Sequence, residues 1–403
     1  MIQRNINLSK THSFFLFGAR GAGKTTLLER VFSPNDSLFL SLLEPDLYDQ
    51  FLLEPARFRQ MINQPENSKK RVIVDEVQKL PRLLDLVHLE IQKTTTQKTK
   101  RQFILTGSSA RKLKQSGSNL LAGRAWIYNL YPLSSLELAE KFDLKTALEF
   151  GGLPEPYLAA IGDATEATQK KVFRQEAVEF LNAYVGTYLQ KEIQEEGWVK
   201  NLAPFRKFLS VAAQMNGQII NKSNIARDVG IHDVTIANYF EILEDTLLGF
   251  LLPAFDLSVR KAQRKAPKFY FIDTGIKRAL DRTLRVELLP QTSAFGDAFE
   301  HWVVLELLKN SSYRRLDWEF SYLRSKDDVE IDLVIDRPGQ PRLLVEIKST
   351  EKIMDSDAKA LESLGRDLDP KADRWLLSQD QIERKIGGTR ALHWQKALEE
   401  LFG

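Results

Sequence analysis

Apolar residues form short runs in the first third of the chain, and stretches with helical spacing separate these runs. Runs rich in β-forming residues lie at 13–17, 71–76 and 102–106. Strands that alternate with helices in this way favour a parallel sheet, with ligands at the carboxyl ends of the strands. We therefore predict an α/β domain over residues 1–132.

The next segment, 133–215, has apolar residues at three- and four-residue spacings, most regularly between 173 and 193. This spacing predicts amphipathic helices that pack as a bundle. A glycine- and proline-rich stretch at 151–156 divides the segment. We expect a helical lid over the first domain that passes its state to the rest of the chain.

Residues 216–285 have the pattern of a winged helix. The pattern begins with a short helix at 223–229, which Ser223 would cap. A tight turn at Gly230 and a second helix at 234–248 complete a helix-turn-helix. We expect this module to bind DNA, although winged helices also bind proteins.

Two apolar runs, at 247–252 and 269–272, would pair as the wing of this module. The expected tip of the hairpin carries five cations: Arg260, Lys261, Arg264, Lys265 and Lys268. Cations at a wing suit contacts with DNA phosphates, which position a protein without reading sequence. A solvated hairpin tip is the alternative, and the wing makes DNA contact the interpretation that we favour.

Composition narrows the function classes. Of 403 residues, 43% are hydrophobic and 28% are charged, which is typical of a globular protein. The net charge is only +3, so affinity for nucleic acid has to come from local clusters. Cysteine is absent, which excludes disulfides, thiolate zinc sites and cysteine nucleophiles. Without a long apolar run or a signal-peptide core, we expect a soluble, cytoplasmic protein that has no membrane partner.

The first chemical motif follows the first strand. Residues 18–25, GARGAGKT, have the P-loop pattern GxxxxGK[ST] between a strand and a helix. The backbone N–H groups of such a loop surround phosphate oxygens, Lys24 would reach the β- and γ-phosphates, and the Thr25 hydroxyl would bind Mg²⁺. ATP and Mg²⁺ are therefore the expected ligands. The predicted nucleotide-binding residues of the loop are Gly18, Ala19, Arg20, Gly21, Ala22, Gly23, Lys24, Thr25 and Thr26.

The second half of such a site is an acidic strand end. The apolar strand 71–76 ends in Asp75, which would hold Mg²⁺, and in Glu76, which would polarise the attacking water as a general base. Strand, P-loop, helix and acidic strand end together predict a nucleoside triphosphatase.

Two further features could complete the site. The strand 102–106 leads into a Gly-Ser-Ser turn, and Thr106, Ser108 or Ser109 could sense the γ-phosphate. Ser108 is our candidate, although the sequence leaves the choice open. Arg124 follows a glycine and could enter the γ-phosphate site of a neighbouring subunit as an arginine finger. A surface salt bridge explains its spacing equally well.

Two strands in the last third carry charges on one face. The strand 329–335 alternates with period two and contains Asp332, and after a turn the strand 343–348 contains Glu346 and Lys348. Paired as a hairpin, the strands would bring these three side chains together.

A helix that begins near 295 adds Glu300 on an inward stripe, where a metal would be its partner. Carboxylates that hold Mg²⁺ and a lysine that polarises the nucleophile are what phosphodiester hydrolysis needs. The set Glu300, Asp332, Glu346 and Lys348 predicts a PD-(D/E)xK, restriction-endonuclease-like α/β domain over 290–403. Charges at the edge of an ordinary α/β sheet are the alternative, and cleavage stays open because such folds also bind DNA without cutting it.

Together, the motifs resemble a family of bacterial and archaeal AAA+ ATPases that join an ATPase domain, a winged helix and a PD-(D/E)xK nuclease-like domain. They are GARGAGKTT (18–26), VIVDEVQKLP (72–81), ILTGSS (104–109), LAGRA (121–125), GGLPE (151–155), and EIDLVI with VEIKS. The resemblance implies an ATPase that self-associates through Arg124, as a homo-hexameric ring. It also implies that ATP turnover moves or remodels DNA, with branched structures such as Holliday junctions among the substrates. No second sensor arginine can be placed in 133–215.

Three hypotheses follow. The first is a DNA-dependent motor for repair or recombination, and the second is an ATP-regulated, Mg²⁺-dependent nuclease of a defence system. The third is a nucleotide-controlled signalling switch whose winged helix binds a protein. Salt-sensitive DNA binding would separate the first two from the third, and Mg²⁺-dependent nicking would separate the nuclease from the motor.

Overall fold

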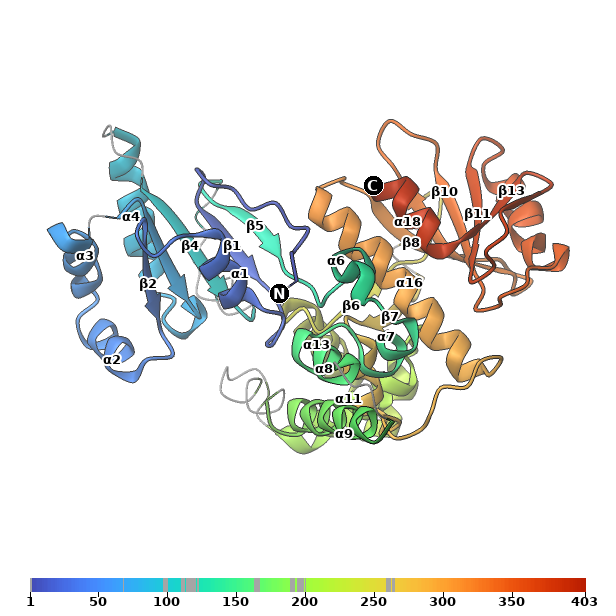
Figure 1. The fold of residues 1–403 in the computed structure, drawn as a ribbon, viewed down its shortest axis with the longest axis horizontal. Helices are drawn as coiled ribbons and strands as arrows, with labels where there is room; N and C mark the ends of the chain where they lie inside the picture. Colours follow the sequence, from blue (N-terminus) through green and yellow to red (C-terminus); the bar gives the residue numbers. More distant parts are fainter. Residues whose placement is uncertain are drawn as a thin grey trace. The chain divides into compact units, whose positions relative to one another are not determined.

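The computed structural model describes residues 2–67, 69–96, 101–109, 113, 121, 123–162, 167–188, 193, 199, 201–258, 262 and 265–403 (Figure 1). The chain divides into two compact units. The N-terminal unit comprises Arg4–Pro132 and Ile242–Leu248. The C-terminal unit comprises Leu133–Glu241, Gly249–Gly403 and the first residues up to Gln3. Within the described residues, no helix has both the length and the apolar character that a membrane-spanning helix needs.

The N-terminal unit contains a five-stranded sheet of order β2-β3-β4-β1-β5. All four strand pairs are parallel, as the sequence predicts. The strands are β1 (Phe14–Phe17), β2 (Ser37–Ser41), β3 (Arg71–Asp75), β4 (Gln102–Gly107) and β5 (Trp126–Asn129). The helices are α1 (Lys24–Val31), α2 (Pro45–Leu53), α3 (Ala56–Ile62) and α4 (Leu83–Thr96). Every residue of β1 and β4 is buried, because a parallel sheet is covered on both faces.

The C-terminal unit begins with helices. They are α6 (Ser135–Leu138), α7 (Leu144–Phe150), α8 (Pro154–Ile161), α9 (Ala167–Ala183), α11 (Leu202–Gln214), α12 (Lys222–Val229), α13 (Asp233–Asp245) and α15 (Thr274–Leu280). The helical segment that the sequence predicts after residue 133 is therefore present. The glycine- and proline-rich stretch that divides it includes the turn between α7 and α8.

A buried carboxylate organises this turn. Asp273 Oδ2 accepts hydrogen bonds from the backbone N–H groups of Gly152 at 2.6 Å and Leu153 at 3.1 Å. Its Oδ1 accepts from the N–H of Ile276 at 2.9 Å and so caps α15. Gly151 has φ +77°, and a Cβ on it would lie 2.0 Å from Asp273 Oδ1. Only glycine therefore fits this turn.

The two helices of the predicted helix-turn-helix and the two strands of the predicted hairpin are present in the structure. The turn between α12 and α13 uses Gly230 at φ 85°, and β6 (Gly249–Leu252) pairs antiparallel with β7 (Lys268–Phe271). The predicted cap was wrong: Asn221, whose side chain accepts from the N–H of Asn224 at 3.0 Å, caps α12 in place of Ser223. The Asn side chain is one residue ahead of the helix, where it can reach the free N–H groups of the first turn.

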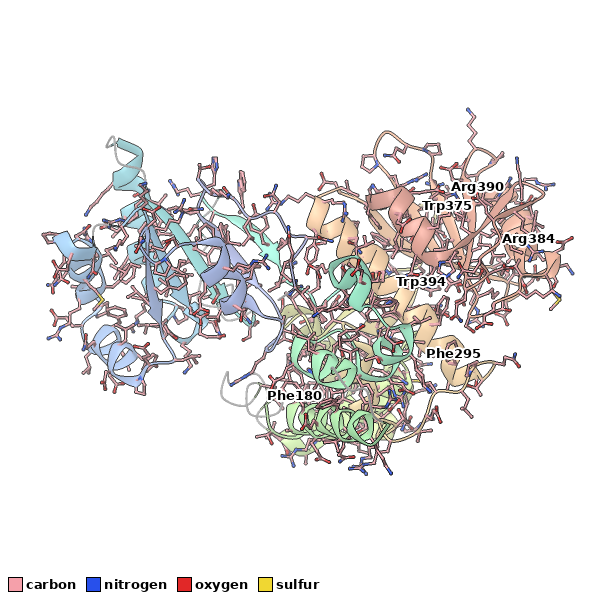
Figure 2. All side chains as sticks on the ribbon, viewed as in Figure 1. Phe180, Phe295, Trp375, Arg384, Arg390 and Trp394 are labelled. Atoms are coloured by element: carbon pink, nitrogen blue, oxygen red, sulfur yellow. The ribbon has the colours of Figure 1, made fainter. Side chains whose placement is uncertain are left out.

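The last part of the C-terminal unit is a six-stranded mixed sheet of order β12-β13-β11-β10-β9-β8. Its strands are β8 (Glu319–Arg324), β9 (Glu330–Asp336), β10 (Leu343–Ile347), β11 (Asp373–Ser378), β12 (Arg384–Ile386) and β13 (Thr389–His393). The helices are α16 (Ser293–Arg314), α17 (Arg366–Leu368) and α18 (Trp394–Phe402). Trp302 of α16 and Trp394 of α18 share one buried core with β9 and β10. The Arg390 guanidinium lies 5.5 Å from the centre of the Trp375 ring (Figure 2).

The chain that leaves β6 continues along β8. The N–H of Tyr322 donates to the Pro253 carbonyl at 2.9 Å, and the N–H of Phe255 donates to the Tyr322 carbonyl at 2.6 Å. The Tyr322 hydroxyl also donates to the Ala266 carbonyl at 2.6 Å. The hairpin and the C-terminal sheet are thus joined through the backbone as well as through side chains.

Candidate functional site

The P-loop lies between β1 and α1. Gly21 and Gly23 have φ of 78° and 91°, which L-residues with a side chain rarely adopt. No side chain caps α1, so the N–H groups of its first turn remain available to an anion. Lys24 is buried, and its Nζ donates to the Gly18 carbonyl at 2.8 Å. The loop therefore holds its own lysine at the place where phosphate oxygens would bind.

Two oxygen ligands of the kind that Mg²⁺ prefers meet beside this loop. Thr25 Oγ1 donates to Asp75 Oδ2 at 3.2 Å. Asp75 comes from the end of β3, and its other oxygen accepts from the hydroxyl of Thr106 on β4. A threonine hydroxyl and a carboxylate fit the few protein ligands that Mg²⁺ takes when nucleotide phosphates supply others.

Glu76 follows Asp75 in a left-handed backbone conformation, with φ 57°. Its backbone N–H donates to Thr106 Oγ1 at 3.3 Å. A non-glycine residue at positive φ persists only where its surroundings hold it, and such residues cluster at functional sites. The backbone here turns the Glu76 side chain away from the direction that the strand would give it.

Gln78, which the sequence analysis missed, connects Glu76 to the end of β4. Its side-chain Nε2 donates to Glu76 Oε2 and to Ser108 Oγ, the latter at 3.2 Å. Gln78 is only 2% exposed, and a Cβ on Gly107 would lie 2.5 Å from its Oε1. Of the three sensor candidates, Thr106 thus contacts Asp75, whereas Ser108 is linked through Gln78 to Glu76. A glutamine two residues after the predicted base was the available signal.

Of the other predicted residues of this site, Ala19, Ala22 and Ser109 are buried, whereas Arg20, Thr26 and Arg124 are exposed. Arg20 and Thr26 lie on the outside of the loop and of α1. Arg124 is exposed, and its Nη1 lies 3.0 Å from Nε2 of His88 on α4. This placement leaves Arg124 at the surface of the N-terminal unit.

The predicted cations of the hairpin divide into three cases. Arg260, Lys261 and Arg264 lie outside the described residues. Lys265 is exposed and pairs with Asp256 at 3.0 Å. Lys268 was placed wrongly at the tip: it is the first residue of β7, opposite Leu252, and it is only 4% exposed. The antiparallel register turns its side chain inward, where DNA phosphates could not reach it.

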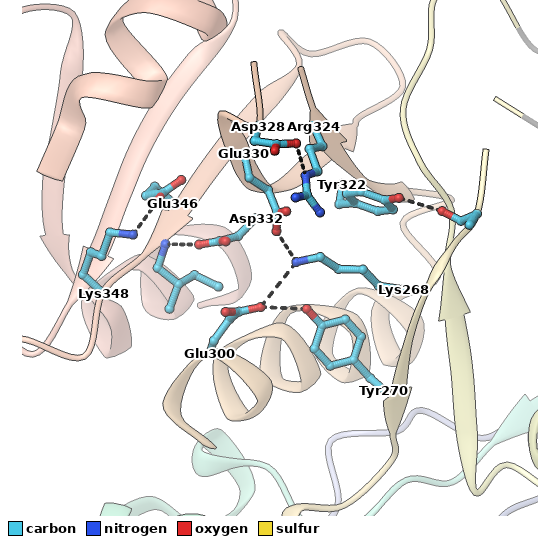
Figure 3. Close-up of polar contacts among 12 residues, drawn as sticks. Lys268, Tyr270, Glu300, Tyr322, Arg324, Asp328, Glu330, Asp332, Glu346 and Lys348 are labelled. Carbon is cyan, nitrogen blue, oxygen red and sulfur yellow. Dashed lines mark hydrogen bonds and ion pairs between the residues drawn. The ribbon is translucent and has the colours of Figure 1, made fainter. Parts of the chain in front are cut away.

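Lys268 instead lies in the C-terminal acidic cluster, which we define as Glu300, Glu330, Asp332 and Glu346 (Figure 3). Its Nζ pairs with Glu330 and lies 3.8 Å from Glu300 Oε1. Tyr270, two residues further along β7, donates its hydroxyl to Glu300 Oε1 at 2.7 Å. The hairpin therefore supplies two of the polar partners of this cluster.

The β9–β10 hairpin brings its predicted residues to one place. Asp332 Oδ2 accepts from the N–H of Ile347 at 2.7 Å, and Lys348 Nζ lies 2.6 Å from Glu346 Oε1. Continuing the antiparallel register, in which Val345 pairs with Leu333, sets Glu346 opposite Asp332. The sequence pattern anticipated this juxtaposition, because alternation fixes which residues share a face.

Burial dominates the electrostatics of the cluster. It raises the pKa of Asp332 to about 7, and the charge of Glu346 adds to the effect. It likewise raises the pKa of Glu300 to about 7, with the charge of Asp332 acting in the same direction. Burial opposes the charged form of Lys268, but Glu300 and Glu330 outweigh it and raise the pKa of this lysine. The ammonium ion is thus held charged among carboxyl groups.

The cluster does not form a metal-binding set as its side chains stand. Across the described part of the chain, no group of three or more His, Asp or Glu side chains is arranged to hold a metal ion. The partners of Glu300 are Tyr270 and Lys268, where the sequence analysis expected a metal. Glu346 Oε2 is buried and has no hydrogen-bond partner among the described residues.

Three family models match parts of the chain. A model described as an AAA domain matches residues 10–139. Over this segment the chain is similar to AAA domains. Two models of domains of unknown function match the rest, DUF8612 over residues 141–287 and DUF4143 over residues 295–396.

Two curated relatives match most of the chain. An uncharacterized protein of Mycobacterium tuberculosis is 25% identical over 330 residues, which cover 81% of this chain and 68% of that protein. An uncharacterized protein of Methanocaldococcus jannaschii is 25% identical over 416 residues, with 95% and 84% covered. Among solved structures, RuvB of Thermotoga maritima has a TM-score of 0.34 at 16% identity, with 63% of this chain and 86% of RuvB covered. That likeness is too weak to transfer a function.

Proposed function

We propose that this protein is an AAA+ ATPase that hydrolyses ATP to move on or remodel DNA, branched DNA in particular. The observation that supports hydrolysis is the meeting of Thr25 Oγ1 and Asp75 Oδ2 at 3.2 Å beside the P-loop. Glu76 follows Asp75 directly, so a ligand pair for Mg²⁺ and a candidate base occur together.

In this proposal each residue of the AAA domain has one task. The N–H groups at the start of α1 and the Lys24 ammonium bind the phosphates. Thr25 and Asp75 would hold Mg²⁺, whose charge offsets that of the phosphate oxygens. Glu76 accepts the proton of the attacking water. Gln78 positions Glu76 and links it to Ser108, through which the γ-phosphate would be sensed.

Assembly and DNA contact are further parts of the proposal. Arg124 acts in the neighbouring subunit of a homo-hexameric ring, which agrees with its exposure in the single chain. The hairpin contacts DNA through Arg260, Lys261, Arg264 and Lys265, which leaves Lys268 out of the original set. Because these contacts are to phosphates, binding should weaken steeply with salt.

The test is ATP hydrolysis without DNA and with single-stranded, duplex and four-way-junction DNA. Glu76→Gln should abolish hydrolysis, whereas Glu29→Gln, an exposed change on α1, should leave it intact. We expect stimulation by DNA that is greatest with junctions. A rate that no DNA changes, with Glu76→Gln still inactive, would keep the ATPase and refute the motor in favour of the signalling switch.

A further inference from the structure

Lys268 comes to the acidic cluster from outside the C-terminal sheet. It opens β7, whose partner is β6, whereas Glu330, Asp332 and Glu346 lie on β9 and β10 and Glu300 lies on α16. The sequence separation between Lys268 and Glu330 is 62 residues, and their contact exists only in the folded unit. The cluster is therefore completed by a neighbouring element.

The surroundings of Lys268 suit an ammonium ion. Its Nζ pairs with Glu330, lies 3.8 Å from Glu300 Oε1 and lies 5.5 Å from the centre of the Tyr322 ring. A lysine that is 4% exposed would carry a heavy desolvation penalty without such partners. The carboxylates, in turn, would repel one another without a cation between them.

A divalent metal would need the same carboxylate oxygens. Metal ions of the Mg²⁺ class bind oxygen ligands directly, and an ammonium ion beside them is repelled by the metal. Figure 3 shows Glu330 and Glu300 directed toward the end of the Lys268 side chain, whereas the Asp332 carboxylate accepts from the N–H of Ile347. Lys268 and a metal are therefore alternatives.

We propose that Lys268 is the resident cation of the acidic cluster, where it takes the place of a divalent metal and keeps the metal out. The cluster binds a divalent cation only when the Lys268 ammonium is removed. Glu346 Oε2, which is buried and has no partner among the described residues, would then be one of the oxygen ligands of that cation. This inference does not depend on ATP hydrolysis.

Mn²⁺ binding tests the proposal, with free Mn²⁺ measured by electron paramagnetic resonance in the absence of nucleotide. The full chain carries Asp75→Asn, so that the AAA domain does not contribute a site. With Lys268 intact we expect no stoichiometric binding at millimolar Mn²⁺. Lys268→Met should add one site per chain, at least about tenfold tighter than any residual binding. Adding Asp332→Asn should remove that site again.

Lys265→Met is the matched control, because Lys265 belongs to the same hairpin but is exposed and pairs outside the cluster. It should leave Mn²⁺ binding as it was. A folded Lys268→Met protein that binds no Mn²⁺ would overturn the proposal. A Mn²⁺ site that is present with Lys268 intact and is lost in Asp332→Asn would also overturn the proposal. Because this second comparison leaves Lys268 unchanged, it decides the question even if Lys268→Met fails to fold.

Discussion

Asp273 ties two segments that are 120 residues apart, and Asp273→Ala should destabilise the C-terminal unit strongly. The carboxylate is 1% exposed and accepts from the N–H groups of Gly152, Leu153 and Ile276. In the variant these three donors lose their acceptor where water does not reach. A buried, unsatisfied N–H costs about 1–3 kcal/mol. Burial raises the pKa of Asp273, which means that the buried carboxylate itself carries a desolvation cost that the variant no longer bears. We therefore expect the free energy of unfolding to fall by about 3–5 kcal/mol, less than the sum for three N–H groups.

Urea unfolding monitored by tryptophan fluorescence measures this loss, because Trp302, Trp318, Trp375 and Trp394 all lie in the C-terminal unit. Asp143→Ala is the matched control: Asp143 is an exposed cap of α7 that accepts from one N–H, that of Thr146, at 2.7 Å. That variant should lose about 1 kcal/mol. Equal losses in the two variants would refute the role assigned to the buried carboxylate.

Three further changes have defined outcomes. Gln78→Leu removes the link between Glu76 and Ser108, and kcat for ATP should fall about tenfold or more with KM little changed in steady-state assays. Glu306→Gln removes a fully buried carboxyl group, and burial raises the pKa of this group to about 7. Because the folded state then binds the proton more firmly than the unfolded state, the stability of the wild type falls as the pH rises from about 4.5 to 7. The difference in the free energy of unfolding between the variant and the wild type, measured by urea unfolding, should therefore shift in favour of the variant by up to about 3 kcal/mol from pH 5 to pH 8. Gly275→Ala would place a Cβ 2.1 Å from the Phe150 carbonyl oxygen and should lower the thermal midpoint by several degrees.

Local patterns predicted those parts of the molecule that depend on neighbours in sequence. The P-loop, the acidic strand end and the parallel pairing of the N-terminal strands follow from strand and helix periods and from one motif. The alternation in β9 and β10 likewise predicted that Asp332 and Glu346 would meet, because a hairpin joins neighbouring segments.

Contacts over long separations were beyond such patterns. Lys268 stands among the cations of the hairpin in sequence, but the pairing of Leu252 with Lys268 turns it toward carboxylates that are more than 30 residues away. Gln78 shows the same limit, since its partner Ser108 lies 30 residues further along the chain. A polar residue gives no local indication of which distant group it will bind.

The backbone bonds between Pro253, Phe255 and Tyr322 have a consequence for aggregation. They cover the outer edge of β8, whose N–H and C=O groups would otherwise be open to a strand of another molecule. At the opposite edge, β12 has only three residues, Arg384, Lys385 and Ile386, and two of them are charged. Changes that detach residues 253–255 from Tyr322 should therefore promote aggregation, because they open the β8 edge to a strand of another molecule.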